Sequence, residues 1–216
     1  MLVLFLVVFV DLIGFGLLIP LLPFYVQRVG ETADVITAVL GLYSLAQFLA
    51  APVWGALSDR FGRKPVLVAT SFGFTASFLM LAFADNLPLL IASRVFGGLM
   101  AGNIAAAQAY IGDITTPQNR ARGMGVIGAA FGLGFVFGPA IGGVLGGPDL
   151  AHANYTAPAL AAAGLTALAA VGAALFLKES LPAERRRRRN GLFDFTVLSG
   201  RRRLACLAIE IGRAHV

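Results

Sequence analysis

Six apolar segments, each long enough to cross a bilayer, constrain this chain more than any other feature of its sequence. A helix needs about 20 apolar residues to span the hydrocarbon core, and six segments meet that length: roughly Leu2–Val26, Ile36–Leu57, Pro65–Ala84, Leu87–Ile111, Arg122–Gly146 and Ala157–Leu177. Hydrophobic residues make up 58% of the chain and charged residues 13%, which leaves too little polar surface to cover a soluble fold. The sequence therefore predicts an all-α membrane protein with six transmembrane helices.

The positions of the basic residues predict the orientation of these helices. Nearly all of the 17 Lys and Arg residues lie in alternate connections: Arg60, Arg63, Lys64, Arg120, Arg122, Lys178, Arg185–Arg189 and Arg201–Arg203. The opposite connections hold only Arg28. Because basic loops stay on the cytoplasmic side, we expect a cytoplasmic N-terminus and a cytoplasmic Arg-rich segment in a multi-pass protein of the cytoplasmic membrane. Membrane topology explains the net charge of +6 better than a nucleic-acid partner does.

The sequence divides into a membrane part, a linker and a short C-terminal remainder. We expect residues 1–177 to form the six-helix unit, 178–203 a basic cytoplasmic linker, and 204–209 the start of a truncated seventh helix. The Arg185–Arg189 run could bind anionic lipid or nucleic acid, and a flexible topology anchor is the preferred interpretation. The last seven residues, "EIGRAHV", can be encoded by the start of a widely used sequencing adapter, so we hypothesise that 210–216 is not biological. The single cysteine, Cys206, excludes an internal disulfide.

A charged stretch, "GALSDRFGRKPVL", separates the second and third apolar segments. Gly55 would allow close helix packing at the end of the second span, and Asp59 and Arg63 are four residues apart, so they could pair on one helical turn. A basic loop that only fixes topology would explain Arg60, Arg63 and Lys64. It would not explain Asp59.

The fourth span contains the stretch "RVFGGLMAGNIAAAQAYIGD". Arg94 is costly at membrane depth unless it faces a cavity or a partner, snorkels outward or donates to backbone carbonyls. Asp113 ends the span on the predicted cytoplasmic side, where it could join the charges of the preceding loop or cap the helix before "TTPQ".

The fifth span carries glycines at four-residue steps within "GLGFVFGPAIGG". Ala130, Gly134, Gly138, Gly142 and Gly146 predict one continuous ridge of small residues, with Pro139 interrupting the backbone hydrogen bonds beside it. Such a ridge lets a neighbouring helix approach closely and slide or bend.

Several polar residues lie within the predicted spans. Asp11 could carry a proton, form a fixed ion pair or cap a broken turn near Gly14 and Gly16. Gln47, Asn103 and Gln108 could line a cavity or form interhelical hydrogen bonds.

Three of these stretches resemble signature motifs of the major facilitator superfamily. The resemblance covers Leu2 to about Arg203 and is greatest to the drug:proton antiporters that include the tetracycline exporters. It implies the N-terminal half of the fold, built from two three-helix inverted repeats, with the C-terminal half as its missing partner. In such proteins the loop motif forms a cytoplasmic gate, which here would comprise Gly55, Asp59, Arg60, Gly62, Arg63, Lys64 and Asp113.

The same resemblance implies proton-coupled efflux of small drug-like molecules by alternating access. Arg94 and Asp11 would serve proton coupling, and the antiporter motif would comprise Gly134, Gly138, Pro139, Gly142 and Gly143. No cofactor is expected besides the coupling proton. Ser77 stands where tetracycline exporters have an aspartate, so the resemblance does not extend to tetracycline as the substrate.

Two other functions remain as alternatives. Solute uptake would keep the superfamily, but the fifth-span motif is typical of exporters. A membrane enzyme or a six-span scaffold is the third hypothesis. The two histidines, His152 and His215, form no catalytic or metal-binding pattern, so the sequence does not indicate an enzyme.

Overall fold

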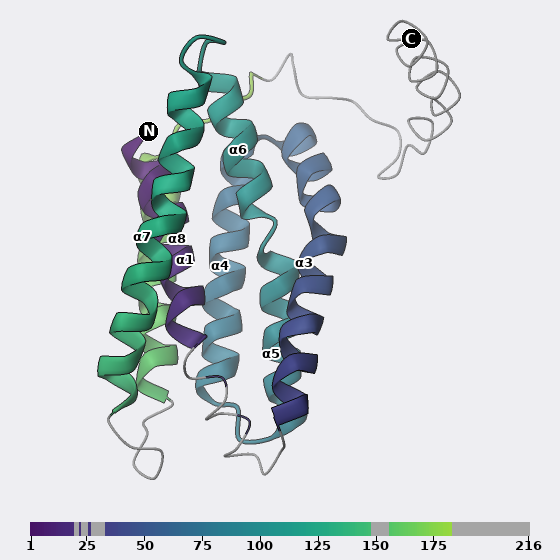
Figure 1. Ribbon diagram of the computed structural model, residues 1–216. Helices are drawn as coiled ribbons and strands as arrows, with labels where there is room; N and C mark the ends of the chain where they lie inside the picture. Colours follow the sequence, from purple (N-terminus) through teal and green to yellow (C-terminus); the bar gives the residue numbers. More distant parts are fainter. Residues whose placement is uncertain (20–21, 23–25, 27–32, 148–155, 183–216) are drawn as a thin grey trace, which may run out of the picture.

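A computed structural model describes residues 1–19, 22, 26, 33–147 and 156–182 of the chain. These residues form a bundle of long helices (Figure 1). Arg28, His152, His215, Cys206 and the segments 183–203, 204–209 and 210–216 lie outside the described residues, so the predictions for them stay predictions.

The helices follow the predicted spans, except that α1 ends at Leu18 and most of the remainder of the first predicted span lies outside the described residues. They are α1 (Leu2–Leu18), α3 (Ala33–Phe61), α4 (Arg63–Ala82), α5 (Leu87–Met100), α6 (Asn103–Ile114), α7 (Arg120–Gly146) and α8 (Thr156–Phe176). Within the described residues, five segments are long and apolar enough to cross a membrane, with α5 and α6 together forming one of them, and α1 is a shorter apolar helix of 17 residues. The predicted all-α membrane architecture is confirmed.

The predicted fourth span is two helices rather than one. α5 ends at Met100 and α6 begins at Asn103, with a turn at Ala101 and Gly102 in which the N–H of Ala101 donates to the carbonyl of Gly98. Trp54 on α3 donates its indole N–H to the Leu99 carbonyl (2.5 Å), which an unbroken helix would use for residue 103. The Trp54 ring also lies against Gly102, where any side chain would collide with it. An interhelical donor thus takes up a carbonyl that the interruption releases, as a break at membrane depth requires.

The packing of the helices follows a pseudo-two-fold pattern. The first span, α1, packs mainly against the fifth, α7, and the second span, α3, packs against the fourth through α5. The third and sixth spans, α4 and α8, pack against each other. An axis that exchanges spans one to three with spans four to six maps these pairs onto one another. Because consecutive spans alternate in direction, the two three-helix groups are inverted relative to each other, as predicted.

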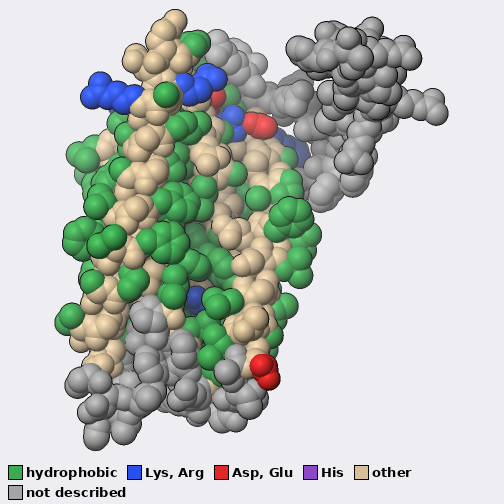
Figure 2. All heavy atoms as spheres, in the orientation of Figure 1, with side chains coloured by type: hydrophobic (Ala, Val, Ile, Leu, Met, Phe, Trp, Pro, Cys, Tyr) green, Lys and Arg blue, Asp and Glu red, His purple; other side chains and the backbone are tan. Residues whose placement is uncertain are grey.

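The surface separates apolar flanks from a basic end. Large apolar side chains are exposed along the helices, including Phe48, Val144 and Leu168 at 71–83% of their full area, and in a bilayer they would face lipid or another protein. Lys and Arg side chains gather near one end of the bundle, at the top of the view in Figure 2. Beneath the surface lie two clusters of buried hydrophobic residues, one around Leu81 and Phe78 and the other around Leu67 and Ile111.

Candidate functional site

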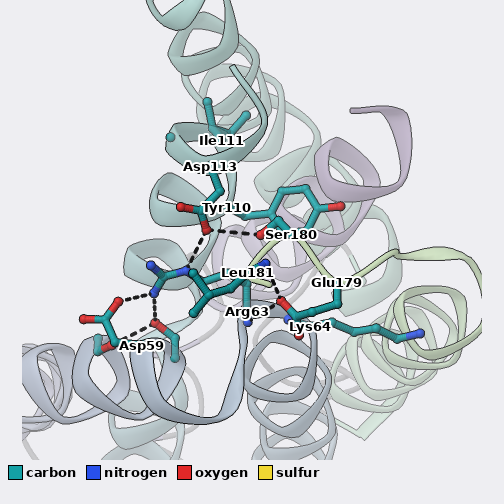
Figure 3. Close-up of polar contacts among 12 residues, drawn as sticks. Asp59, Arg63, Lys64, Tyr110, Ile111, Asp113, Glu179, Ser180 and Leu181 are labelled. Atoms are coloured by element: carbon teal, nitrogen blue, oxygen red, sulfur yellow. Dashed lines mark hydrogen bonds and ion pairs between the residues drawn. The ribbon is translucent and has the colours of Figure 1, made fainter. Parts of the chain in front are cut away.

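Arg63 is the centre of a charge cluster where α3 meets α4 (Figure 3). One nitrogen of its guanidinium lies 2.6 Å from a carboxylate oxygen of Asp59, and Nε donates to Asp113 at 3.0 Å. Nη1 also donates to Ser58 Oγ (2.6 Å), which in turn donates to the Gly55 carbonyl (2.8 Å). The Arg63 side chain is 9% exposed, against 45% for Asp59 and 25% for Asp113. One arginine thereby joins the ends of α3 and α6 to the start of α4.

Glu179 completes this cluster from the segment that follows α8. Its carboxylate accepts hydrogen bonds from the backbone N–H groups of Arg63 (2.9 Å) and Lys64 (3.3 Å). These N–H groups belong to the first turn of α4 and have no partner within the helix. The positive end of the helix dipole also stabilises a carboxylate at this position. We call Asp59, Arg63, Asp113 and Glu179 the junction cluster.

The backbone at Gly62 makes this arrangement possible. Gly62 is the only residue between α3 and α4, and its φ of 110° is accessible to glycine and rarely to other residues. A side chain at this position would also collide with the Glu179 carboxylate. The predicted loop is therefore a one-residue junction, and Asp59 and Arg63 pair across it rather than along one continuous helix.

The segment after α8 is fixed at the same end of the bundle. Ser180 donates to Asp113 (3.2 Å), Tyr110 on α6 donates to the Lys178 carbonyl (2.8 Å), and Leu181 is 7% exposed. Residues 178–182 were expected to begin a flexible linker. They pack on the bundle instead, because their acidic and backbone groups serve as partners for α4 and α6.

The sequence prediction for this region holds in part. The expected Asp59–Arg–Asp113 cluster is confirmed, and its arginine is Arg63. Arg60 is exposed, with its guanidinium 5.3 Å from the ring centre of Phe61. Gly55 does not serve the expected close packing, since a Cβ there would meet nothing within 4 Å among the described residues. The sequence did not identify Glu179 as a member of this cluster. Its only signal was an acidic residue near the basic run of the expected linker.

Asp11 lies buried at the centre of the bundle. The residue is 4% exposed, and its Oδ2 accepts hydrogen bonds from Asn103 Nδ2 (2.5 Å) and Ser71 Oγ (3.3 Å). Asn103 is the first residue of α6, so the turn between α5 and α6 places this amide against α1. Oδ1 of Asp11 accepts no hydrogen bond from any described residue. Such an atom is costly in an apolar interior unless a proton, water or ligand reaches it.

A cavity of about 160 Å³ adjoins Asp11. Its lining includes Gln47 and Asn103, which were predicted to line a cavity, and five aromatic residues: Phe15, Tyr43, Phe74, Phe131 and Phe135. Gln108 is exposed on α6 and does not line this cavity, so its assignment stays a prediction. Gly14 and Gly16 lie within the unbroken helix α1, so the alternative in which Asp11 caps a broken turn beside them is wrong.

Arg94 is buried rather than snorkelling outward. It is 5% exposed, and its guanidinium lies within 3.4 Å of the hydroxyls of Ser93 and Ser77 and 5.7 Å from the ring centre of Phe78. Ser77 itself donates to the Ser93 carbonyl (2.7 Å). The serine in place of an aspartate thus gives Arg94 a neutral oxygen at this point instead of a charged one.

The glycine ridge of α7 packs against α1. Ala130, Gly134, Gly138, Gly142 and Gly146 are all buried. A Cβ on Gly138 would lie 2.8 Å from the Gly16 Cα, and one on Gly134 would lie 2.6 Å from the Leu12 Cβ. Pro139 contributes to the same interface, with its Cδ near Gly16. Gly143 differs, because a Cβ there would meet nothing within 4 Å among the described residues.

Comparisons of the sequence and of the structure with known proteins find the same group of transporters. A family profile described as Major Facilitator Superfamily matches residues 4–211. The class C tetracycline resistance protein of Escherichia coli is 42% identical over 179 residues, which is 82% of this chain and 44% of that protein. Multidrug resistance protein 2 of Bacillus subtilis is 32% identical, over 83% of this chain and 44% of that protein.

A solved structure shares the same arrangement of helices. The human organic anion transporter MFSD10 superimposes with a TM-score of 0.74 and 32% identity, over 87% of this chain and 49% of that one. This chain therefore spans about half the length of the relatives that it matches.

Proposed function

The chain belongs to the major facilitator superfamily, and we propose that it forms the N-terminal half of a proton-coupled exporter of drug-like small molecules. Its relatives are transporters rather than enzymes, and two of those compared above carry tetracycline or multidrug resistance in their names. The membrane is the cytoplasmic membrane, with the N-terminus and the basic end of the bundle in the cytoplasm. The substrate reaches the bundle from lipid or cytoplasm, and a C-terminal half completes the pathway.

Asp11 is the single observation that carries the proposal. A buried carboxylate at membrane depth, with one oxygen that no described residue satisfies and a cavity beside it, is suited to take up and release a proton. Asn103 and Ser71 hold the other oxygen, so the carboxylate keeps its orientation when the proton leaves. Arg94 lies among serine hydroxyls on α4 and α5 and supplies the second charge in the coupling path.

The junction cluster acts as the cytoplasmic gate. Arg63 ties α3 and α6 to α4, and Glu179 ties the end of the sixth span to the same point. Held together, these ends form one rigid surface that closes against the C-terminal half in the outward-facing state. The α7 ridge is the surface on which α1 and α7 rock during export, because its glycines let the two backbones approach closely.

The test uses the complete coding sequence that contains this chain, expressed in a host that lacks its own efflux pumps. Cells are loaded with a panel of fluorescent dyes and antibiotics, and extrusion is followed with and without a protonophore. We expect protonophore-sensitive extrusion that Asp11→Asn abolishes. Gly128→Ala, on α7 where a Cβ would meet nothing within 4 Å among the described residues, should leave extrusion intact. Extrusion that a protonophore does not affect would overturn proton coupling. Proton-driven accumulation inside the cell would replace export with uptake.

A further inference from the structure

We propose that Asn103 is a positioning residue that links Asp11 to the junction cluster through α6, the short helix that carries Asn103 at one end and Asp113 at the other. This link holds α6 in place while Asp11 is charged and releases it when Asp11 is neutral. The link itself is a property of this chain. That it operates during transport rests on the function proposed above.

The two ends of α6 contact the two charged sites of the bundle. At its first residue, Asn103 Nδ2 donates to Oδ2 of Asp11 on α1 (2.5 Å). In its last turn, Asp113 accepts a hydrogen bond from Arg63 Nε (3.0 Å). The helix has 12 residues, so it is about 18 Å long. A helix of this length moves largely as one rigid unit, and a shift at Asn103 therefore displaces Asp113.

The interruption of the fourth span allows α6 to move without α5. A turn at Ala101 and Gly102 separates the two helices, and Trp54 on α3 holds the α5 side of that turn through the Leu99 carbonyl. α5 packs extensively against α3 and α4, whereas α6 packs less against both. An unbroken helix would pass a shift of Asn103 to both sides. The turn instead serves as a hinge, so the shift is directed towards the junction cluster.

The strength of the hydrogen bond from Asn103 depends on the charge of Asp11. Hydrogen bonds to ionised groups are roughly twice as strong as those between neutral groups. Neutral Asp11 therefore holds α6 less tightly, and the preference of α6 for the observed position falls about three- to tenfold. Such a difference in contact between two states is what allows one site to bias another.

Ser71 offers an alternative path between the same two sites. It is the second donor to Oδ2 of Asp11, at 3.3 Å, and it lies on α4, which also carries Arg63. However, α4 runs unbroken from Arg63 to Ala82 and packs against α8, α5 and α3. A change at Ser71 therefore acts on a helix that three neighbours hold in place. We expect little of it to reach the junction cluster, which makes Ser71→Ala the control for the path.

The test is amide hydrogen exchange of the 216-residue chain in lipid nanodiscs, with Asp11→Asn as the permanently neutral form. We expect this variant to accelerate exchange about three- to tenfold in residues 103–115 and at the N–H groups of Arg63 and Lys64. Exchange in residues 87–98 of α5 should stay within about twofold of that in the unaltered chain. Acceleration that is absent from α6, or equal in α5 and α6, would overturn the proposal.

Variants identify the residue that carries the link. Asn103→Leu keeps the approximate size of the side chain and removes the donor. In that background, Asp11→Asn should cause no further acceleration in residues 110–115, whereas in the Ser71→Ala background it should cause the full acceleration. This double-mutant cycle isolates the coupling, because a merely structural role of Asn103 would leave the two effects additive.

A response to Asp11→Asn that survives Asn103→Leu, or that disappears in Ser71→Ala, would contradict the proposed path. The comparison of α5 with α6 in Asp11→Asn alone keeps the proposal testable where Asn103→Leu fails to fold.

The outcome is separable from that of the proposed function. Proton-coupled export by the full-length protein, together with no exchange response in α6, would overturn the link and leave the exporter. An exchange response in α6 of a protein without proton-coupled export would do the reverse.

Discussion

The contact between α1 and α7 predicts that alanine substitutions at two glycines of α7, Gly138 and Gly143, have opposite effects on the stability of the bundle. In Gly138→Ala, the new Cβ would lie 2.8 Å from the Cα and carbonyl carbon of Gly16 and 2.9 Å from the Ile13 carbonyl oxygen. All three are backbone atoms, so no side-chain rotation relieves the overlap. The helices must separate by about half an ångström to restore ordinary contact, and such overpacking typically costs about 1–3 kcal/mol.

Gly143→Ala is the matched control on the same helix. Its Cβ would meet no described residue within 4 Å, and alanine is favoured over glycine in a helix by about 1 kcal/mol. Thermal unfolding of the 216-residue chain in detergent, followed by circular dichroism, measures both variants. For a chain of this size, we expect Gly138→Ala to lower the melting temperature by about 2–12 °C and Gly143→Ala to leave it unchanged or raise it. Equal shifts in the two variants would refute the role assigned to the ridge.

Three further changes test the contacts at the junction cluster and at the break in the fourth span. Arg63→Lys should lower the free energy of unfolding by about 1–3 kcal/mol, because one ammonium cannot reach Asp113 and Asp59 in two directions. Arg60→Ala is the control, and its free energy of unfolding should stay within about 0.5 kcal/mol of that of the unaltered chain in the same melting experiment. Glu179→Gln should cost about 0.5–1 kcal/mol through the loss of charge at the start of α4, and the difference should shrink at high salt; a salt-independent loss would argue against the helix-dipole contribution. Trp54→Phe removes the donor to the Leu99 carbonyl and should lower the free energy of unfolding by about 1 kcal/mol. It should also accelerate amide hydrogen exchange around residues 99–103. Unchanged exchange there would show that the turn does not depend on Trp54.

The spans could be predicted from the sequence because their length and hydropathy are local properties. The break between α5 and α6 could not, since both helices belong to one apolar stretch and the indole that takes up the released Leu99 carbonyl lies 45 residues away in the chain. Asp11 was a candidate for proton coupling, and Asn103 was a candidate to line a cavity or to form an interhelical hydrogen bond. Their hydrogen bond depends on the rotation of α1 against α6, which no local pattern encodes.

The junction cluster likewise depends on contacts that no local sequence pattern predicts. The loop motif and the end of the fourth span predict Asp59, an arginine and Asp113, but only the folded structure, with its turn at Gly62, shows that Arg63 joins both acids. Glu179 reaches the start of α4 across 116 residues, and an acidic residue beside a basic run has no distinguishing pattern of its own. Tertiary partners of this kind require the folded structure.

Proton movement during transport measures the proposed coupling itself. The full-length transporter that contains this chain is reconstituted into vesicles with a pH-sensitive dye inside, and an outward substrate gradient is imposed. We expect substrate that leaves the vesicles to draw protons in, so that the interior acidifies, and we expect Asp11→Asn to abolish this pH change. Substrate movement with no pH change, or with protons moving in the same direction as the substrate, would contradict it.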